Sequence, residues 1–492
     1  MISKTSANSQ APRNSIGSTL SALAIVRMIG ERPMRSSTRR LATAAVVLMS
    51  ALSICTPRVW ALEIKRMQLS NGAVLLVSEQ HQLPMVTATI AFDAGSRRDP
   101  TGKEGLAALT AASLMEGTST LSAEDFNEKV DFMGSSISIG PSRDFALATF
   151  TSLKKYQGDT LHLLAQILQQ PGLRDADIER KQAEQIAEIK SSEEEPGYTA
   201  SVAFSHMIFG DTPYGHPAGG TSEAVAKLKP ADVRDFYHQH YKLGSAVIAV
   251  AGDVNTDEIK ALLEKELTGP EGNVPPQPEP ATQAVAPGIH TQIIDRNVAQ
   301  ANLYMGSNGI ARSNPDYYKL QVMNYILGGG GFASRLMKVV RSKAGLAYSI
   351  GSGFQAGKFP GAFVIALETK NASANEAIKL ILQQLREIQE SPVSAAELDS
   401  AKRYLIGSFP LKLDRQSEIV GFMLQTEIYG LGLDYAERYP KIISAISAAD
   451  VQAVAQKYLH PDAIDLVAVA NQAEAKISVA GLEPPKQAAA DH

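Results

Sequence analysis

The sequence of 492 residues contains a single cysteine, Cys55. One cysteine excludes an internal disulfide framework and a cysteine-based zinc site. The formal net charge of −4 is small for this length, and no run of lysine and arginine lies in the part expected to fold, so no nucleic-acid partner is expected. The remaining composition, 44% hydrophobic and 20% charged, is that of a globular chain. Because single cores stop growing near roughly 250 to 300 residues, the length predicts two or more domains.

The N-terminal region has the order of features that a secretory signal has. Arg35, Arg39 and Arg40 precede an apolar stretch, 41–54, and the small residue Ala61 follows. This order predicts a Sec-type signal peptide cleaved after Ala61, and hence a periplasmic or secreted protein. The apolar stretch is shorter than the ~20 residues of a membrane-spanning helix, so a retained anchor is the weaker alternative and no stable membrane span is expected.

Residues 1–33 lie upstream of this complete signal. They indicate either a start codon assigned too early or an extension outside the fold, and the sequence leaves open whether Met1 or Met34 is the true start. A lipoprotein anchored at Cys55 is disfavoured because bulky Ile54 precedes the cysteine. We therefore expect the mature chain to begin at Leu62.

The first half of the mature chain mixes strand and helix patterns without strict alternation. Residues 73–77 and 86–92 follow turn and alternation signals that predict a hairpin of strands. The mixture predicts an α+β fold rather than a doubly wound parallel sheet. Helices are expected at 105–115, 125–133, 161–169, 175–190 and 256–267, with a buried strand at 246–251.

The second half repeats this plan after a segment rich in proline. Residues 269–288 are rich in proline, with Pro275, Pro276, Pro278, Pro280 and Pro287 among them, and hold few large apolar residues, which predicts an extended linker. Strands are expected near 292–294, 302–306, 348–354, 362–368 and 463–470, and a helix at 316–327. The last strand takes the place that 246–251 takes in the first half, so we predict a tandem duplication of two similar domains, each a mostly antiparallel sheet packed with helices. The predicted parts are 1–61 (extension and signal peptide), 62–268 (first domain), 269–288 (linker), 289–482 (second domain) and 483–492 (tail).

Several separated segments resemble one family of zinc peptidases. The first is Ala94-Gly-Ser-Arg-Arg-Asp-Pro100, followed by Gly105-Leu-Ala107 and by Met115-Glu-Gly-Thr118. Further segments in the same order are Tyr214-Gly-His-Pro217, Gly220, Phe236 to Tyr241, and Ala251-Gly-Asp253. Together they are similar to the pitrilysin and mitochondrial processing peptidase family, in its bacterial two-domain form. The resemblance implies a pitrilysin-like fold of the LuxS-metallohydrolase type.

The family's zinc motif falls on residues that cannot bind a metal. The motif is His-x-x-Glu-His on a helix, where two histidines on one face bind zinc and the glutamate acts as general base. Aligned here without gaps, these three roles fall on Ala108, Ala112 and Ala111, respectively. The third ligand implied by the resemblance is Glu188, with Glu184 as the second choice. A catalytic zinc needs about three protein ligands, so no metal is expected in this chain.

The histidines supply no replacement for the lost ligands. His238 and His240 lie in an aromatic stretch, where packing or a surface location is the favoured interpretation. His206 and His216 give no metal spacing, and the other histidines are isolated in sequence.

The second half carries a further resemblance. Leu327-Gly-Gly-Gly-Gly-Phe-Ala-Ser-Arg-Leu336 and Val340-Arg-Ser-Lys-Ala-Gly-Leu-Ala-Tyr-Ser349 are close to the second-domain signature of bacterial family members. The resemblance implies that Arg341 and Tyr348 face the zinc from the opposite domain and stabilise the substrate and its oxyanion. It places Gly328, Gly329, Gly330, Gly331 and Phe332 beside the substrate cleft. These glycines are not a phosphate loop, because no Gly-Lys-Ser/Thr follows.

These observations lead to a functional hypothesis. The resemblance implies a non-catalytic subunit of a heterodimeric zinc metallopeptidase, inactive alone, which supplies Arg341 and Tyr348 to a partner chain. The expected partner is a homologous secreted subunit with an intact His-x-x-Glu-His, which holds the zinc, and the expected substrate is an unfolded peptide. One alternative is a peptide-binding or scaffold protein with no proteolytic role, and another is a metalloenzyme with unusual ligands. The sequence does not distinguish a homodimer from a heterodimer, and it identifies neither the substrate nor the cleavage preference.

Overall fold

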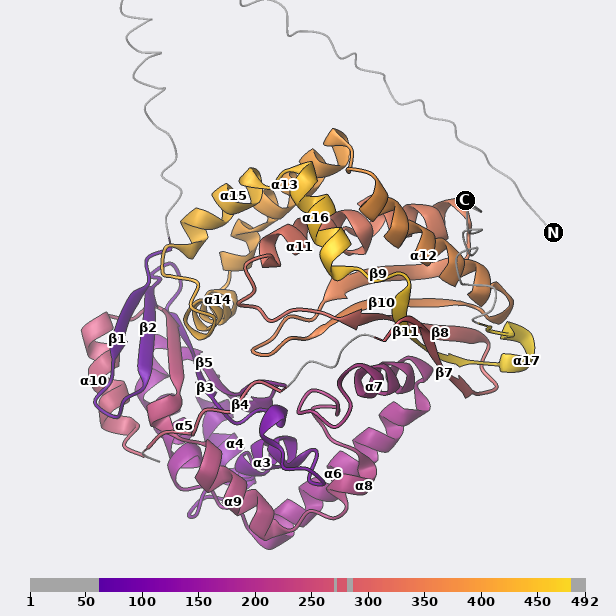
Figure 1. The fold of residues 1–492 in the computed structure, drawn as a ribbon. Helices are drawn as coiled ribbons and strands as arrows, with labels where there is room; N and C mark the ends of the chain where they lie inside the picture. The colour runs from indigo at the N-terminus through magenta and orange to yellow at the C-terminus, as the bar shows by residue number, and fades with distance from the viewer. Residues whose placement is uncertain (1–61, 270–271, 281–285, 479–492) are drawn as a thin grey trace, which may run out of the picture. The chain divides into compact units, whose positions relative to one another are not determined.

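The computed structural model describes residues 62–269, 272–280 and 286–478, and the chain from Leu62 onward forms one compact unit. The predicted signal peptide and the predicted tail lie outside the described residues. Two β-sheets, each with helices packed against it, make up this unit (Figure 1). Within the described ranges, no helix is both long and apolar enough to cross a membrane.

The first sheet has six strands in the order β1-β2-β6-β3-β5-β4. Only the pair β2 and β6 is parallel, and every other neighbouring pair is antiparallel. The central strands β3 and β6 are short runs of small and β-branched apolar residues, as strands covered on both faces usually are. The strands are β1 (Lys65–Gln68), β2 (Val74–Glu79), β3 (Met85–Phe92), β4 (Ser136–Pro141), β5 (Ala146–Leu153) and β6 (Val247–Gly252).

The second sheet has five strands in the order β7-β11-β8-β10-β9. Here too a single pair, β7 and β11, is parallel. The order matches that of β2-β6-β3-β5-β4, strand for strand, which confirms the predicted fold of two similar, mostly antiparallel α+β halves. The strands are β7 (Gly288–Asp295), β8 (Gln300–Asn308), β9 (Ala347–Phe354), β10 (Ala362–Lys370) and β11 (Ala463–Ala470).

One prediction about pairing is wrong. The strands expected to form a hairpin, now β2 and β3, do not pair with each other, because β6 lies between them. The partner of β2 in a hairpin is instead β1, which was not predicted. Strand β6 comes about 160 residues later in the chain, so no local turn signal could have indicated that it inserts here.

The helices of the two halves also correspond. The predicted helix at 316–327 begins as α11 and continues as a π-helical turn, η4 (Tyr325–Gly329). In α12, buried residues recur at helical spacing, as expected for a helix with one face on the core. The helices of the first half are α3 (Leu106–Leu114), α4 (Ala123–Phe132), α5 (Gln157–Gln169), α6 (Asp175–Glu194), α7 (Pro196–Phe209), α8 (Ser222–Val225), α9 (Pro230–His240) and α10 (Thr256–Glu266). Those of the second half are α11 (Tyr317–Asn324), α12 (Ala374–Glu390), α13 (Ala395–Ser408), α14 (Gln416–Ile428), α15 (Tyr435–Ala445), α16 (Ala448–Tyr458) and α17 (Gln472–Ala475).

One helix from each half packs on the sheet of the other half. Helix α7 contacts β8 and β11, and helix α14 contacts β3 and β6 (Figure 1). Buried Ala200, Phe204 and Ile208 of α7 share a core with Val467 and Val469. Buried Ile419, Val420 and Met423 of α14 share a core in the same way with Leu76, Ala249 and Ala251. The two sheets are therefore joined by a reciprocal exchange of helices.

A buried hydrogen-bond cluster also joins the halves. The Tyr214 hydroxyl donates to Oδ1 of Asp144 at 2.5 Å and accepts from the backbone N–H of Phe359 at 3.1 Å. Oδ2 of Asp144 accepts from the backbone N–H of Lys358 at 2.9 Å. Burial, followed by the negative charge of Asp144, raises the pKa of the Tyr214 phenol, so the hydroxyl keeps its proton and serves as a donor. These bonds hold the turn between β9 and β10 against the first half.

The described part of the proline-rich segment has neither helix nor strand up to residue 287, and β7 begins at Gly288. It is attached to the first half by hydrogen bonds from the N–H of Val274 to Oγ of Ser245, at 2.8 Å, and from the Arg98 guanidinium to the carbonyl of Pro275, at 2.9 Å. Gln277 is bonded to Arg97, whose side chain is fully buried. The segment therefore packs along the surface of the first half.

Candidate functional site

Helix α3 carries the three alanines that occupy the positions of the zinc motif. Ala108 and Ala112 are half-buried and lie one turn apart on the same face of the helix, whereas Ala111 is fully buried in the core of the first half. Their methyl groups offer no lone pair to a metal ion or to a water molecule. The helix therefore has the geometry that the motif requires, but it lacks the side-chain nitrogen and oxygen atoms that would bind zinc.

The start of α3 is held by the segments that resemble the family. The two carboxylate oxygens of Asp99 accept from the backbone N–H groups of Gly105 and Ala107 at 2.8 and 2.7 Å, which satisfies free donors of the first turn. Burial raises the pKa of Asp99 to about 7. Gly105 adopts a φ of +96°, and a Cβ there would lie 2.6 Å from the carbonyl oxygen of Gly219. These landmark residues thus form a frame around the helix.

Helix α6, which carries Glu184 and Glu188, is fixed to the same frame. The amide of Gln185 donates to the carbonyls of Gly105 and Gly219 at 3.1 and 2.8 Å. Buried Glu116, from the Met115-Glu-Gly-Thr118 segment, pairs with Arg180 and, at 3.0 Å, with Lys181. The contact between α3 and α6 places the degenerate motif beside the helix that carries the expected third ligand.

The two candidate carboxylates on α6 differ in their surroundings. Glu184 accepts from Arg180 and from Lys181, both at 2.8 Å, and hydrogen bonds from these cations lower its pKa. The exposed carboxylate of Glu188 forms no ion pair or side-chain hydrogen bond with another described residue. Of the two carboxylates, Glu188 is therefore the one without a side-chain partner among the described residues.

The donor set does not fit a catalytic zinc ion. Three methyl groups and one carboxylate provide a single ligand, and a catalytic zinc takes about three from the protein. Nowhere in the described ranges do three or more His, Cys, Asp or Glu side chains gather so that they could hold a metal ion. No catalytic step through a metal on this chain can therefore be built from these residues.

The histidines have other surroundings. The ring of His240 lies 4.4 Å from that of Phe236, and burial lowers its pKa to about 4. His81 pairs with Asp253 at 2.7 Å, and His162 pairs with Glu266 at 2.7 Å. Each of these three histidines contacts an aromatic ring or a carboxylate, and none of them is paired with a second histidine among the described residues.

The second half brings three of the expected site residues together. The Arg341 guanidinium lies 4.7 Å from the ring centre of Phe332 and 5.2 Å from that of Tyr348. The two aromatic residues are 70% and 80% exposed, respectively, which is unusual for rings of this size. An arginine in contact with two accessible rings forms a preorganised surface for a carboxylate, a carbonyl oxygen or another chain.

Local structure positions these three residues. Arg341 lies on the π-helical segment η6 (Met337–Lys343), which packs against the edge strand β9, where Tyr348 is the second residue. Of the glycines expected beside the cleft, Gly328 and Gly329 lie in η4 and Gly331 lies in the turn η5 (Gly331–Ala333), with Gly330 between the two. Gly328 is packed so closely that a Cβ would lie 2.7 Å from the backbone nitrogen of Ser352 on β9. A glycine is needed there so that the helix turn can approach the strand.

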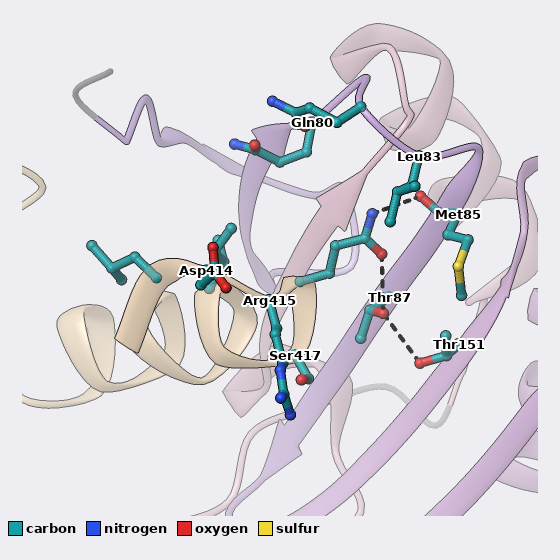
Figure 2. A pocket seen from close by; sticks show the side chains of 12 residues that line it. Gln80, Leu83, Met85, Thr87, Thr151, Asp414, Arg415 and Ser417 are labelled. Atoms are coloured by element: carbon teal, nitrogen blue, oxygen red, sulfur yellow. Dashed lines mark hydrogen bonds between the residues drawn. The ribbon is translucent and has the colours of Figure 1, made fainter. Parts of the chain in front are cut away.

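A cavity of about 650 Å³ lies where α14 meets the first sheet (Figure 2). Its floor contains Thr87, whose hydroxyl is bonded to that of Thr151 at 3.1 Å and to the side chain of Gln416. Gln416 also donates to the carbonyl of Met85 at 3.0 Å. No local pattern in the sequence indicates this cavity, because α14 and the strands that form its walls are more than about 250 positions apart in the chain.

The fold and the site together define a class of protein, a duplicated peptidase-like chain whose motif helix lacks metal ligands. Comparison with known proteins gives the family. Residues 74–222 match the family described as Insulinase (Peptidase family M16), and residues 227–405 match the Peptidase M16 inactive domain. The chain belongs to peptidase family M16.

Relatives and solved structures agree with this assignment. The chain is 26% identical to the Non-peptidase homolog YmxG of Helicobacter pylori over 82% of this chain and 93% of that protein. It is 26% identical to the uncharacterized zinc protease YmxG of Bacillus subtilis over 71% and 85%, respectively. Among solved structures it is similar to a peptidase M16 inactive domain from Pseudomonas fluorescens, with a TM-score of 0.78, 28% identity, and coverage of 83% of this chain and 98% of that chain. A protease from H. pylori shares the fold, with a TM-score of 0.75 at 19% identity over 83% and 99% of the two chains.

Proposed function

We propose that this chain is the non-catalytic subunit of a heterodimeric zinc metallopeptidase of family M16. In this proposal a homologous partner with an intact His-x-x-Glu-His holds the zinc, and this chain completes the cleft around an unfolded peptide. One observation carries the proposal: the motif helix keeps its frame and has alanine at all three chemical positions, while Arg341 and Tyr348 remain together and exposed.

The names of two similar proteins support a member without peptidase activity of its own. One relative is described as a non-peptidase homolog, and a similar solved structure is described as an inactive domain of the family. The residues that fix the start of α3, such as Asp99 and Gln185, are retained. A subunit needs them if the surface of its first half must keep its shape in order to bind a partner. The signal peptide expected ahead of Leu62 supports a location of such a pair in the periplasm or outside the cell.

In the proposed complex, Arg341 and Tyr348 act on the substrate in trans. An arginine fork and a phenol hydroxyl are both suited to a carbonyl oxygen that becomes negative, and an active site that excludes water strengthens such interactions. The contact with the ring of Phe332 restricts the conformations that Arg341 adopts before substrate arrives. Gly329 and Gly331 are exposed, and the lack of a side chain at these two positions lets a peptide backbone come close.

The first test is reconstitution. The chain is purified alone and together with a secreted M16 homologue that keeps His-x-x-Glu-His, for which an adjacent reading frame is the first candidate. We expect zinc and peptide cleavage only in the pair. Stoichiometric zinc and full turnover in the isolated chain would refute the subunit model, and a stable pair that binds peptide without turnover would favour the binding or scaffold alternative.

The second test is Tyr348→Phe in the assembled pair. Loss of one donor to an oxyanion typically lowers turnover by ~10²-fold or more, and the exposed position should leave assembly unchanged. Tyr156→Phe is a matched control, because no described residue is hydrogen-bonded to the hydroxyl of Tyr156. Equal turnover of the two variants would show that Tyr348 has no part in the chemistry.

A further inference from the structure

The strand that carries Tyr348 has an irregular register. Strand β9 pairs with β10 in one register from its C-terminal end back to Ile350, and in a register shifted by one residue at Ala347. Tyr348 and Ser349 therefore lie opposite the single residue Glu368. This is a β-bulge, a feature that occurs often next to active sites, where it redirects a side chain.

The bulge directs Tyr348 away from the core. Side chains in a regular strand alternate between its two faces, so residues three apart point to opposite sides. Ala347 and Ile350 are three apart, yet both belong to the core of the second half. The additional residue in the bulge makes this possible, and it leaves both Tyr348 and Ser349 exposed.

Among the described strands of the first half, the corresponding pair has no such bulge. Strands β4 and β5 are the counterparts of β9 and β10 in the matching strand orders. They pair in one continuous register, from Ser136 with Thr151 to Pro141 with Ala146. The shared fold therefore does not require the bulge, which occurs in the half that carries Tyr348.

A buried threonine holds the chain where the bulge begins. The hydroxyl of Thr369, on β10, donates to the carbonyl of Leu346 at 2.6 Å. Leu346 immediately precedes β9, and its own N–H donates to the carbonyl of Val340 in η6 at 2.9 Å. Leu346 is thus bonded on one side to the segment that carries Arg341 and on the other side to the strand beside β9. These two bonds fix the short connection between Arg341 and Tyr348.

We propose that Thr369 is a positioning residue for Tyr348. Its hydroxyl fixes the start of the bulge, and the bulge sets the direction of the phenol and its distance of 5.2 Å from the Arg341 guanidinium. Thr369 is buried and acts only through Tyr348. That Tyr348 contacts a substrate rests on the proposed function, whereas the placement of Tyr348 by Thr369 rests on the geometry of the strand.

The first test uses amide hydrogen exchange in the isolated mature chain. Thr369→Val keeps the shape of the side chain and removes the hydroxyl, and Thr369→Ser keeps the hydroxyl. We expect the amide of Leu346 to exchange about three- to tenfold faster in the valine variant, as the loss of one neutral hydrogen bond provides, and at nearly the original rate in the serine variant.

Thr426→Val is the matched control for this measurement. The hydroxyl of Thr426 is also buried in the second half and donates to a backbone carbonyl at 2.8 Å, but it lies in α14. The control should leave exchange at Leu346 unchanged. Equal exchange at Leu346 in the two valine variants would overturn the proposal that Thr369 holds the bulge.

The second test measures turnover by the reconstituted pair. Thr369→Val should lower kcat about tenfold or more with KM unchanged, because a small displacement of a group beside the reacting atoms costs up to ~10²-fold. Thr369→Ser should restore kcat, and Thr426→Val should leave it unchanged. A chain with both Tyr348→Phe and Thr369→Val should be no slower than Tyr348→Phe alone, because both changes remove the same interaction. Losses that multiply in the double variant would show that Thr369 does not act through Tyr348.

The outcomes separate this inference from the proposed function. If Tyr348→Phe leaves turnover unchanged, the role assigned to Tyr348 in the proposed function fails, and faster exchange at Leu346 in Thr369→Val still supports Thr369 as the residue that holds the bulge. If Tyr348→Phe lowers turnover and Thr369→Val does not, the proposed function stands and positioning by Thr369 is refuted.

Discussion

Removal of the Tyr214 hydroxyl should loosen the attachment between the two halves of the chain. In Tyr214→Phe, the Asp144 carboxylate loses a donor at 2.5 Å, and the buried N–H of Phe359 loses its acceptor. A hydrogen bond to a charged group contributes about 1.5–3 kcal/mol, and a buried amide without a partner costs about 1–3 kcal/mol. We expect a total loss of about 3 kcal/mol in the free energy that holds the turn between β9 and β10.

The effect should be local, so amide hydrogen exchange is the suitable assay. Each 1.4 kcal/mol corresponds to about a tenfold change in an equilibrium constant, so the backbone amide of Phe359 should exchange about 100-fold faster. Amides in the core strand β6 should change far less. The matched control is again Tyr156→Phe, which removes a hydroxyl with no hydrogen bond to a described residue. Exchange at Phe359 that is the same in both variants would refute the argument that Tyr214 anchors this turn.

Three further predictions follow from individual residues. Burial lowers the pKa of His240 from 6.5 to about 4. The folded chain therefore holds His240 neutral, and its stability falls as the pH drops from 6.5 toward 4 because the unfolded chain takes up the proton first. His240→Phe should show a smaller drop in melting temperature between pH 7 and pH 4.5 than the unmodified chain. Glu116→Gln should lower the free energy of unfolding by about 1.5–3 kcal/mol, measured by urea denaturation, because the buried carboxylate loses its charged contacts with two cations of α6. Ala108→His combined with Ala112→His should create a zinc site that calorimetry detects, and adding Glu188→Gln should weaken it; zinc affinity that is indifferent to the last change would mean that Glu188 does not face the motif helix.

Much of the fold could be predicted from local patterns. The alternation in 86–92 and the apolar run in 463–470 give strands within one residue of β3 and β11, and the charged first turn of α6 gives its start. Strands β4 and β5 were not predicted, although Ser136–Pro141 alternates in polarity. Helix α7 was missed as well: it buries Ala200, Phe204 and Ile208 against the sheet of the other half, a partner that local sequence does not reveal.

The candidate site was predictable in its residue types and not in its contacts. The position of Ala108 and Ala112 on one helix face follows from their spacing. The capping of α3 by Asp99 and the bonds of Gln185 to Gly105 and Gly219 join segments up to about 115 residues apart, and no periodicity indicates them.

The exchange of α7 and α14 has a consequence for the origin and the handling of this protein. Neither half is a self-sufficient folding unit, because each lends the other the helix that shields one side of its sheet from water. Expressed separately, either half would expose the apolar face of its helix and an uncovered face of its sheet. Two copies of the same half could cover both surfaces by exchanging these helices, as in domain swapping. Fusion of the genes for two such chains, which had exchanged helices as a dimer, would produce this architecture. After the fusion, one half could lose its catalytic residues while the helices that join the two halves stayed in place.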